Sequence, residues 1–184
     1  MFNKGDEVWL EVGFGAGEHL VAQAERSPDI GFIGCEPYIN GVAKVLSEIK
    51  KKSLNNILLH NDDARHVLEK LAPASIGKVF ILFSDPWPKK RHNRRRFINY
   101  ENLNALSRVM KDRAKLRFAT DDMSFVRWAL NVFHRHPDFD WLDDGPEDWR
   151  NRYDDAISTR YEEKAIKRGQ QCIYLTFRRC PRNK

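Results

Sequence analysis

The chain has 184 residues, a usual size for one domain, so its length predicts a single compact unit spanning residues 1–184. Lys and Arg number 32 against 26 Asp and Glu, and the net charge of +6 suits a polyanionic partner without requiring one. The sequence contains no run of about 18 apolar residues and no apolar signal core near its start, which argues against a membrane protein and favours a soluble, unexported one.

The predicted elements alternate short apolar runs with amphipathic stretches, which is typical of strand–helix units that build a parallel sheet. Gly, Asp, Asn or Pro residues bound each apolar run. Between the runs, apolar residues recur at helical spacing, so we expect helices that cover the faces of the sheet. The predicted strands in the first two thirds of the chain are 8–12, 31–35, 57–60, 79–83 and 116–119.

The pattern changes in the last third of the chain. Residues 143–159 are acidic and polar and contain a Gly-Pro pair, which predicts a long loop with Trp149 and Tyr153 as possible anchors. A closing strand is predicted over 172–177, and the segment 139–142 is expected to pair with it.

A glycine-rich loop follows the first predicted strand. Glu11 precedes three glycines at alternate positions, which permit a tight turn and let a ligand approach the backbone. A dinucleotide-binding loop would place its third glycine one residue later, and the Glu11 carboxylate would repel a pyrophosphate. The same carboxylate suits the ammonium group of S-adenosylmethionine, so the loop favours that cofactor over NAD. The glycines are Gly13, Gly15 and Gly17.

Carboxylates also follow the second and third predicted strands. Glu36 ends the second strand, where it is either a solvated side chain or an acceptor for both hydroxyls of a ribose. Asp62 and Asp63 follow the third strand at the same edge, and one of them is a candidate acceptor for an adenine amino group. Alternatively, either aspartate caps the helix predicted to begin near Ala64.

The most specific segment is Phe-Ser-Asp-Pro-Trp-Pro at 83–88, directly after the fourth predicted strand. Ligands of open α/β sheets bind outside the carboxyl ends of the strands, so Asp85 should face the same crevice as the glycine loop. Prolines on both sides of Trp87 stiffen the backbone there. Six of the next eight residues are basic, and beside Asp85 this favours contact with RNA phosphates over a solvated face or a localisation signal. These residues are Lys89, Lys90, Arg91, Arg94, Arg95 and Arg96.

Together these motifs resemble the bacterial tRNA (guanine-N7)-methyltransferase family. The resemblance extends from Val8 to Phe177 and includes Ala-Thr-Asp at 119–121 and Thr-Arg-Tyr-Glu at 159–162. It implies an α/β class I methyltransferase fold: a mainly parallel seven-stranded sheet with an antiparallel last strand and helices on both faces. It further implies methyl transfer from S-adenosylmethionine to N7 of the variable-loop guanosine numbered 46 in tRNA.

The resemblance also assigns residues. It implies that the cofactor-binding carboxylates are Glu11, Glu36, Asp63 and Asp85, and it selects Asp63 over its neighbour because the Asp-Ala step of the family falls there. By themselves the two later motifs are weak, since an aspartate after a strand can cap a helix and a Thr-x-x-Glu sequence is an ordinary capping box. The substrate-binding residues that the resemblance implies are Lys89, Asp121, Thr159, Arg160, Tyr161 and Glu162.

The implied reaction needs no strong general base. Guanine N7 carries an in-plane lone pair and can attack a sulfonium methyl group without first losing a proton. Catalysis then depends mainly on aligning guanine N7 with the methyl group, and a carboxylate can stabilise the positive charge that passes to the purine. We therefore predict that Asp85 is the catalytic residue.

Two features depart from the family pattern. Ser84 stands where the family generally has proline, which loosens the turn before Asp85. The family also leads us to expect an additional N-terminal segment that helps to hold tRNA. The tryptophan of Asp-Pro-Trp is typical of the bacterial form, so we expect no separate partner subunit, and both a monomer and a homodimer stay open.

Other interpretations are a catalytically silent RNA-binding protein, a methyltransferase of another RNA or of a small molecule, and a nicotinamide-dependent oxidoreductase. A metal site is not expected, because only His134 and His136 are close among the six histidines and no second cluster supplies further ligands. Cys35, Cys172 and Cys180 are far apart, which predicts neither a disulfide nor a zinc site and fits a reducing cytoplasm.

Overall fold

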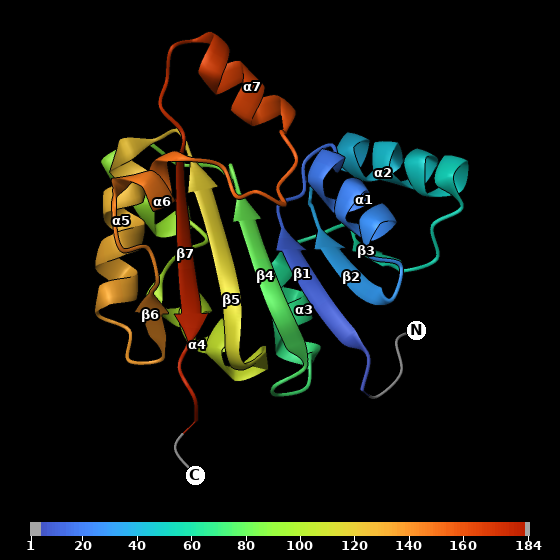
Figure 1. Cartoon of the computed structure of the whole chain (residues 1–184), viewed down its shortest axis with the longest axis horizontal. Coiled ribbons are helices and arrows are strands. Elements are labelled where there is room, and N and C mark those ends of the chain that lie inside the picture. Colours follow the sequence, from blue (N-terminus) through green and yellow to red (C-terminus); the bar gives the residue numbers. More distant parts are fainter. Residues whose placement is uncertain (1–4, 183–184) are drawn as a thin grey trace.

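The computed structural model describes residues 5–182 and contains a seven-stranded sheet with helices on both faces (Figure 1). The strand order is β3-β2-β1-β4-β5-β7-β6. Neighbours from β3 to β5 pair in parallel, whereas β7 runs antiparallel to both β5 and β6. The predicted sheet is therefore confirmed. Its strands are β1 (Glu7–Val12), β2 (Ile30–Cys35), β3 (Ile57–His60), β4 (Ile76–Leu82), β5 (Met110–Thr120), β6 (Phe139–Trp141) and β7 (Ile173–Arg179).

The helices bury one apolar stripe each against the sheet. Leu20 of α1 and Val45 of α2 belong to a core cluster on one face, over β2. Leu106 of α4 and Phe125 of α5 belong to a larger cluster on the other face, to which α3 also contributes. The helices in the described residues are α1 (Glu18–Arg26), α2 (Ile39–Lys52), α3 (Ala64–Lys70), α4 (Tyr100–Val109), α5 (Met123–His134), α6 (Pro146–Arg150) and α7 (Arg160–Lys167), with a 3₁₀ helix, η1 (Lys90–Arg95).

This topology gathers the candidate residues at one edge of the sheet. Because β1 to β5 are parallel, their carboxyl ends lie together, at the top of the sheet in Figure 1. The loops that follow these strands carry the glycine-rich turn, the predicted carboxylates and the basic segment. The helix α7 lies above the same edge. A ligand-binding site is therefore expected at this edge, outside the carboxyl ends of the strands.

Several elements differ from the sequence-based expectation. β4 and β5 begin earlier than predicted, because Gly77 and Lys78 in β4 and the polar residues 111–113 in β5 interrupt the apolar runs, and β7 extends to Arg179. The predicted long loop contains the short helix α6. Both predicted anchors are confirmed: Trp149 packs against the larger core, and the Tyr153 hydroxyl donates to the Leu175 carbonyl at 2.8 Å.

Within residues 5–182 no helix combines the length and the apolar character that crossing a membrane would need. Cys35, Cys172 and Cys180 are free thiols, and the first two are buried.

Candidate active site

The glycine loop leaves β1 with its backbone in the left-handed region. Gly13, Gly15 and Gly17 have φ of 72°, 59° and 79°. A Cβ on Gly15 would lie 2.9 Å from the ring of Tyr161, and one on Gly17 would lie 2.1 Å from a methyl group of Val45. Both backbone conformation and space therefore require glycine here. Gly13 and Gly15 line the cavity described below, while Gly17 is buried against α2.

Glu36, which follows the last residue of β2, is hydrogen-bonded to this loop. Its buried carboxylate accepts hydrogen bonds from the backbone amides of Gly15, at 2.8 Å, and Tyr38, at 2.9 Å. A carboxylate has about four lone-pair positions, so further acceptor capacity remains for the hydroxyls of a ligand. Gly41 was not singled out in the sequence, yet a Cβ there would lie 2.1 Å from the Gly15 carbonyl oxygen. This close approach lets α2 support the loop.

Glu11 lies beneath the loop rather than in the cavity wall. Glu11 is 3% exposed, and its carboxylate is hydrogen-bonded to Nδ1 of the buried His19 at 2.7 Å. The Gln23 amide contacts the same imidazole and donates to the Asp155 carbonyl at 2.9 Å. This chain of contacts ties β1 through α1 to the long loop. A direct contact between Glu11 and a cofactor stays a prediction.

Asp62 and Asp63, the two aspartates after β3, both line the cavity. Asp63 caps α3 by accepting from the Arg65 backbone amide at 2.9 Å, as the capping alternative predicted. It also forms an ion pair with the Arg65 guanidinium, and the hydrogen bonds from Arg65 lower the pKa of Asp63 below its ordinary value. Capping does not remove Asp63 from the cavity wall.

A strained turn presents Asp85 at the end of β4. Phe83 and Trp87, on either side of it, have φ of 51° and 45°, which non-glycine residues rarely adopt. Asp85 is exposed and lines the cavity together with Ser84 and Trp87. The Ser84 hydroxyl oxygen is buried and has no hydrogen-bond partner within residues 5–182. Backbone strain of this kind, about 1–3 kcal/mol per residue, often occurs at functional sites.

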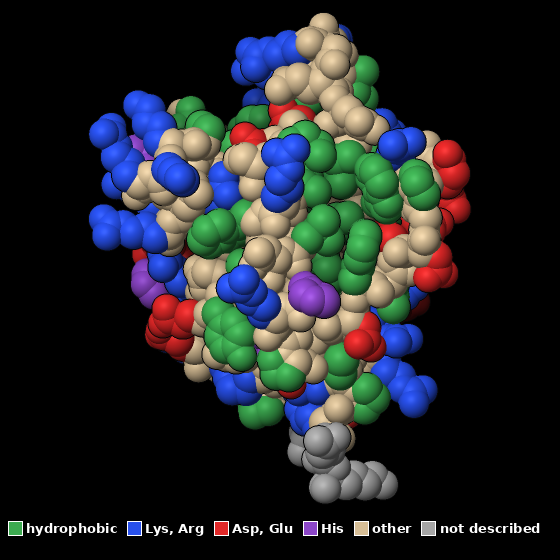
Figure 2. Space-filling view, turned by 90° about the vertical axis from the view of Figure 1, so that its left-hand side faces the viewer, with side chains coloured by type: hydrophobic (Ala, Val, Ile, Leu, Met, Phe, Trp, Pro, Cys, Tyr) green, Lys and Arg blue, Asp and Glu red, His purple; other side chains and the backbone are tan. Residues whose placement is uncertain are grey.

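The basic segment after this turn has two parts. Lys89, Lys90, Arg91, Arg94 and Arg95 are exposed, and Arg95 lies over the Trp87 ring at 4.9 Å. The side of the molecule seen in Figure 2 shows Lys and Arg side chains gathered along its upper left edge.

Arg96 differs from its neighbours because it is only 2% exposed. Its guanidinium donates to the Pro86 carbonyl at 2.7 Å and to the Ser124 hydroxyl at 2.8 Å. It also lies near the rings of Phe125 and Trp128. The expectation that Arg96 offers its charge to RNA phosphates is therefore corrected: the side chain holds the Asp85 turn against α5.

The Thr-Arg-Tyr-Glu motif begins α7. Thr159 and Glu162 form the capping box, and the buried Glu162 also accepts from Arg152 at 2.7 Å and from the Tyr174 hydroxyl. Arg160 donates to Glu18 at 2.9 Å. These contacts fix α7 above the sheet edge. Of the four motif residues, Tyr161 lines the cavity.

The cavity itself encloses about 420 Å³, which is within the usual range of about 300–1,000 Å³ for ligand pockets. Lys89 and Asp121 lie outside its lining. The lining combines bare glycine backbone, four carboxylates, one cation, Arg95, and the Ser84 hydroxyl, which has no partner among the described residues. Four carboxylates against one cation suit a cationic, hydroxyl-rich ligand such as S-adenosylmethionine better than a pyrophosphate. The carboxylates in the lining are Glu36, Asp62, Asp63 and Asp85.

Comparisons with known proteins identify the family of the chain. A family model described as a putative methyltransferase matches residues 6–175. A tRNA (guanine-N(7)-)-methyltransferase of Ruegeria sp. (strain TM1040) is 51% identical over 96% of this chain and 69% of its own length. The protein of the same name from Rhodospirillum rubrum is 49% identical over 96% of this chain and 69% of its own length.

The chain belongs to the tRNA (guanine-N(7)-)-methyltransferase family. The resemblance stated from the motifs is thereby confirmed. Among solved structures, precorrin-6y C5,15-methyltransferase of Geobacter metallireducens has a TM-score of 0.64 at 13% identity, covering 96% of this chain and 80% of that one. The tRNA (m1A58) methyltransferase of Aquifex aeolicus has a TM-score of 0.60 at 16% identity, covering 96% and 63%. At such identities these two relatives show the methyltransferase fold alone.

Proposed function

We propose that this member of the family transfers a methyl group from S-adenosylmethionine to N7 of a guanosine in tRNA. The observation that carries the proposal is the position of Asp85, which lines one cavity with Gly13 and Glu36 and lies four residues before Lys89, where the exposed basic segment begins. A site for a small cationic cofactor and a surface for a polyanion thus meet at one residue. Identity of about half the residues with curated enzymes of this name supports the same reaction.

The chain's own residues would act mainly by positioning. S-adenosylmethionine, when bound, supplies an electrophilic methyl group on a sulfonium. Glu36 and the backbone of the glycine loop would hold the cofactor's ribose and amino-acid end, and Asp63 its adenine. Asp85 would orient the guanine and stabilise the positive charge that the purine gains, while no residue needs to remove a proton from N7 before attack.

The exposed cations would bind the RNA backbone. Lys89 to Arg95 form a short basic surface beside the turn, and Lys and Arg contacts to phosphates give affinity that weakens as salt rises. The ring of Tyr161 is half exposed above the glycine loop and is placed to contact the target base. We also propose a cytoplasmic location, because the proposed substrate is tRNA and the three cysteines are free thiols.

The test is methyl transfer to unmodified tRNA. The protein is incubated with tRNA and S-adenosylmethionine labelled in its methyl group, and the RNA is digested to nucleosides. We expect label in 7-methylguanosine, and its loss in Asp85→Ala and Asp85→Asn, with cofactor affinity measured separately by calorimetry. Asp29→Asn, at an exposed turn at the opposite edge of the sheet, is the matched control and should retain activity.

Each alternative has its own outcome. Cofactor binding without transfer to any RNA would support a silent RNA-binding protein and would refute the proposal. Label in another nucleoside would keep the methyltransferase and reject the guanine N7 target. Full activity in Asp85→Asn would remove Asp85 from catalysis.

A further inference from the structure

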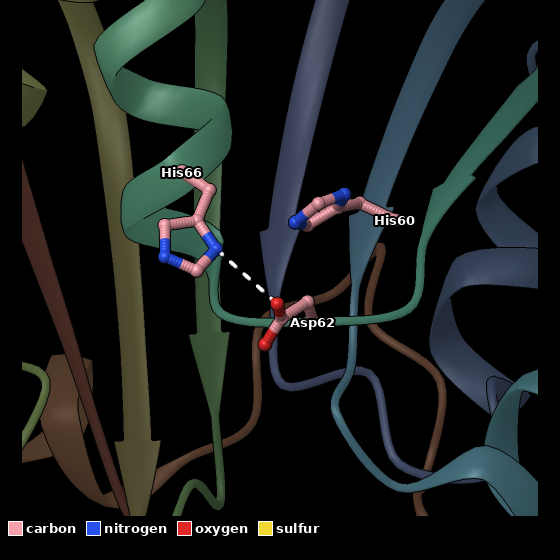
Figure 3. Close-up of side chains that lie close together, drawn as sticks. All are labelled: His60, Asp62 and His66. Carbon is pink, nitrogen blue, oxygen red and sulfur yellow. Dashed lines mark ion pairs between the residues drawn. The ribbon is translucent and has the colours of Figure 1, made fainter.

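Two histidines and an aspartate meet where β3 leads into α3 (Figure 3). His60 is the last residue of β3, Asp62 lies in the turn, and His66 lies in the first turn of α3. One ligand atom from each lies within 4.8 Å of the other two. Figure 3 shows both imidazoles directed toward the Asp62 carboxylate. In the sequence these three residues form no recognisable ligand motif, because the strand end and the turn separate them.

Two contacts orient His66 and Asp62 in a way that suits a bound cation. His66 Nδ1 is 3.3 Å from one carboxylate oxygen of Asp62. The other oxygen accepts a hydrogen bond from the Asp63 backbone amide at 2.7 Å, which orients the carboxylate. Hydrogen bonds to the remaining atoms of ligating side chains are a regular feature of metal sites in proteins.

His60 supplies a second, independent observation. Its Nε2 atom is buried and has no hydrogen-bond partner within residues 5–182. A buried polar group left without a partner costs about 1–3 kcal/mol. A bound cation would satisfy this nitrogen, whereas the ion pair between His66 and Asp62 leaves it unsatisfied.

We propose that His60, Asp62 and His66 bind a divalent transition metal, with Zn²⁺ the best match. Zinc takes His nitrogen and Asp oxygen at about 2.0–2.2 Å in tetrahedral geometry, which places neighbouring ligand atoms about 3.3–3.5 Å apart. The separation of 3.3 Å between His66 and Asp62 already has this value. Mg²⁺ and Ca²⁺ prefer oxygen ligands and fit two imidazoles poorly. Three protein ligands leave the fourth position to water.

The metal site is accessible, and it adjoins the cofactor cavity. The side chains of Asp62 and His66 are 61% and 54% exposed, so a cation can enter and small rotations can close the coordination shell. Asp62 also lines the cavity next to Asp63. A bound ion would therefore fix the turn that carries both aspartates, and it would stabilise the folded chain by mass action.

The test uses the full chain, without a polyhistidine tag, after treatment with a chelator. CoCl₂ is titrated in while the visible absorption is recorded, because tetrahedral Co²⁺ absorbs far more strongly than octahedral Co²⁺. ZnCl₂ is then added as a competitor. We expect one equivalent of Co²⁺ with a tetrahedral spectrum, displaced by one equivalent of Zn²⁺. His60→Ala, Asp62→Asn and His66→Ala should each weaken binding at least tenfold.

His134→Ala is the matched control, because His134 is an exposed histidine on α5 outside the cluster, and this variant should bind as the wild type does. Circular dichroism and thermal unfolding without metal check that each variant folds. Added Zn²⁺ should raise the melting temperature of the wild type but not that of His66→Ala. Absence of stoichiometric binding, or unchanged affinity in His60→Ala, would overturn the proposal. The readout does not depend on methyl transfer, so the two proposals fail separately.

Discussion

Replacing Arg96 with methionine tests how the Asp85 turn is held in place. Arg96 is the cation of the basic segment that lies inside the protein, 2% exposed, with its guanidinium bound to the Pro86 carbonyl and to the hydroxyl and carbonyl of Ser124. Methionine keeps most of the apolar contact with the neighbouring aromatic rings and removes the hydrogen bonds. The Arg96→Met variant therefore isolates the polar part of the interaction.

The size of the effect follows from these bonds. A hydrogen bond to a charged group contributes about 1.5–3 kcal/mol, and an acceptor left unpaired adds a similar cost, while release of a buried cation to solvent offsets part of the loss. We expect a net decrease of about 3 kcal/mol in the free energy of unfolding. For a chain of this size that corresponds to roughly 6–12 °C in melting temperature. The turn that Pro86 belongs to contains the strained Trp87, so it should relax away from its active geometry.

Urea unfolding and steady-state methyl transfer measure the two consequences. The kcat for tRNA methylation should fall more than the affinity for S-adenosylmethionine, because Glu36 and the glycine loop stay intact. Arg94→Met is the matched control: Arg94 is exposed on the same segment, so its unfolding free energy should change by less than about 0.5 kcal/mol. Equal stability of the Arg96 and Arg94 variants, or a change in tRNA affinity alone, would show that Arg96 does not hold the turn in place.

Two further predictions concern the cofactor side of the site. Gly17→Ala should weaken cofactor binding, measured by calorimetry, and lower the free energy of unfolding by about 1–3 kcal/mol, measured by urea unfolding. The reason is that Gly17 has φ of 79° and a Cβ there would collide with Val45. Unchanged affinity and stability would contradict this packing. Asp63 has a pKa held below its ordinary 3.8 by hydrogen bonds from Arg65, so its contribution to stability is present above that pH and is lost as the pH falls below it. NMR titration should find the pKa of Asp63 higher in Arg65→Ala than in the wild type, and an equal pKa would contradict the prediction.

The sequence by itself determined the architecture and the edge of the sheet at which the candidate site residues lie. Apolar runs alternating with amphipathic stretches predicted the order of strands and helices, because burial on both faces of a parallel sheet requires that pattern. The glycine spacing after Glu11 and the Asp-Pro-Trp segment predicted the cofactor class and the reactive turn. Parallel strands end at one edge, so the pattern alone placed Gly13, Glu36 and Asp85 together.

Only the tertiary structure decided which side chains face the cavity and which face inward. Arg96 is indistinguishable in sequence from Arg94 and Arg95, and only the packing of α5 beneath the turn buries it. Glu162 likewise turns inward to Arg152 and Tyr174. Sequence patterns record which residues are near one another along the chain and how polar they are. The direction of a long side chain, by contrast, depends on partners that come from distant segments, and His60 with His66 became a candidate site only when the turn between β3 and α3 brought their nitrogens together.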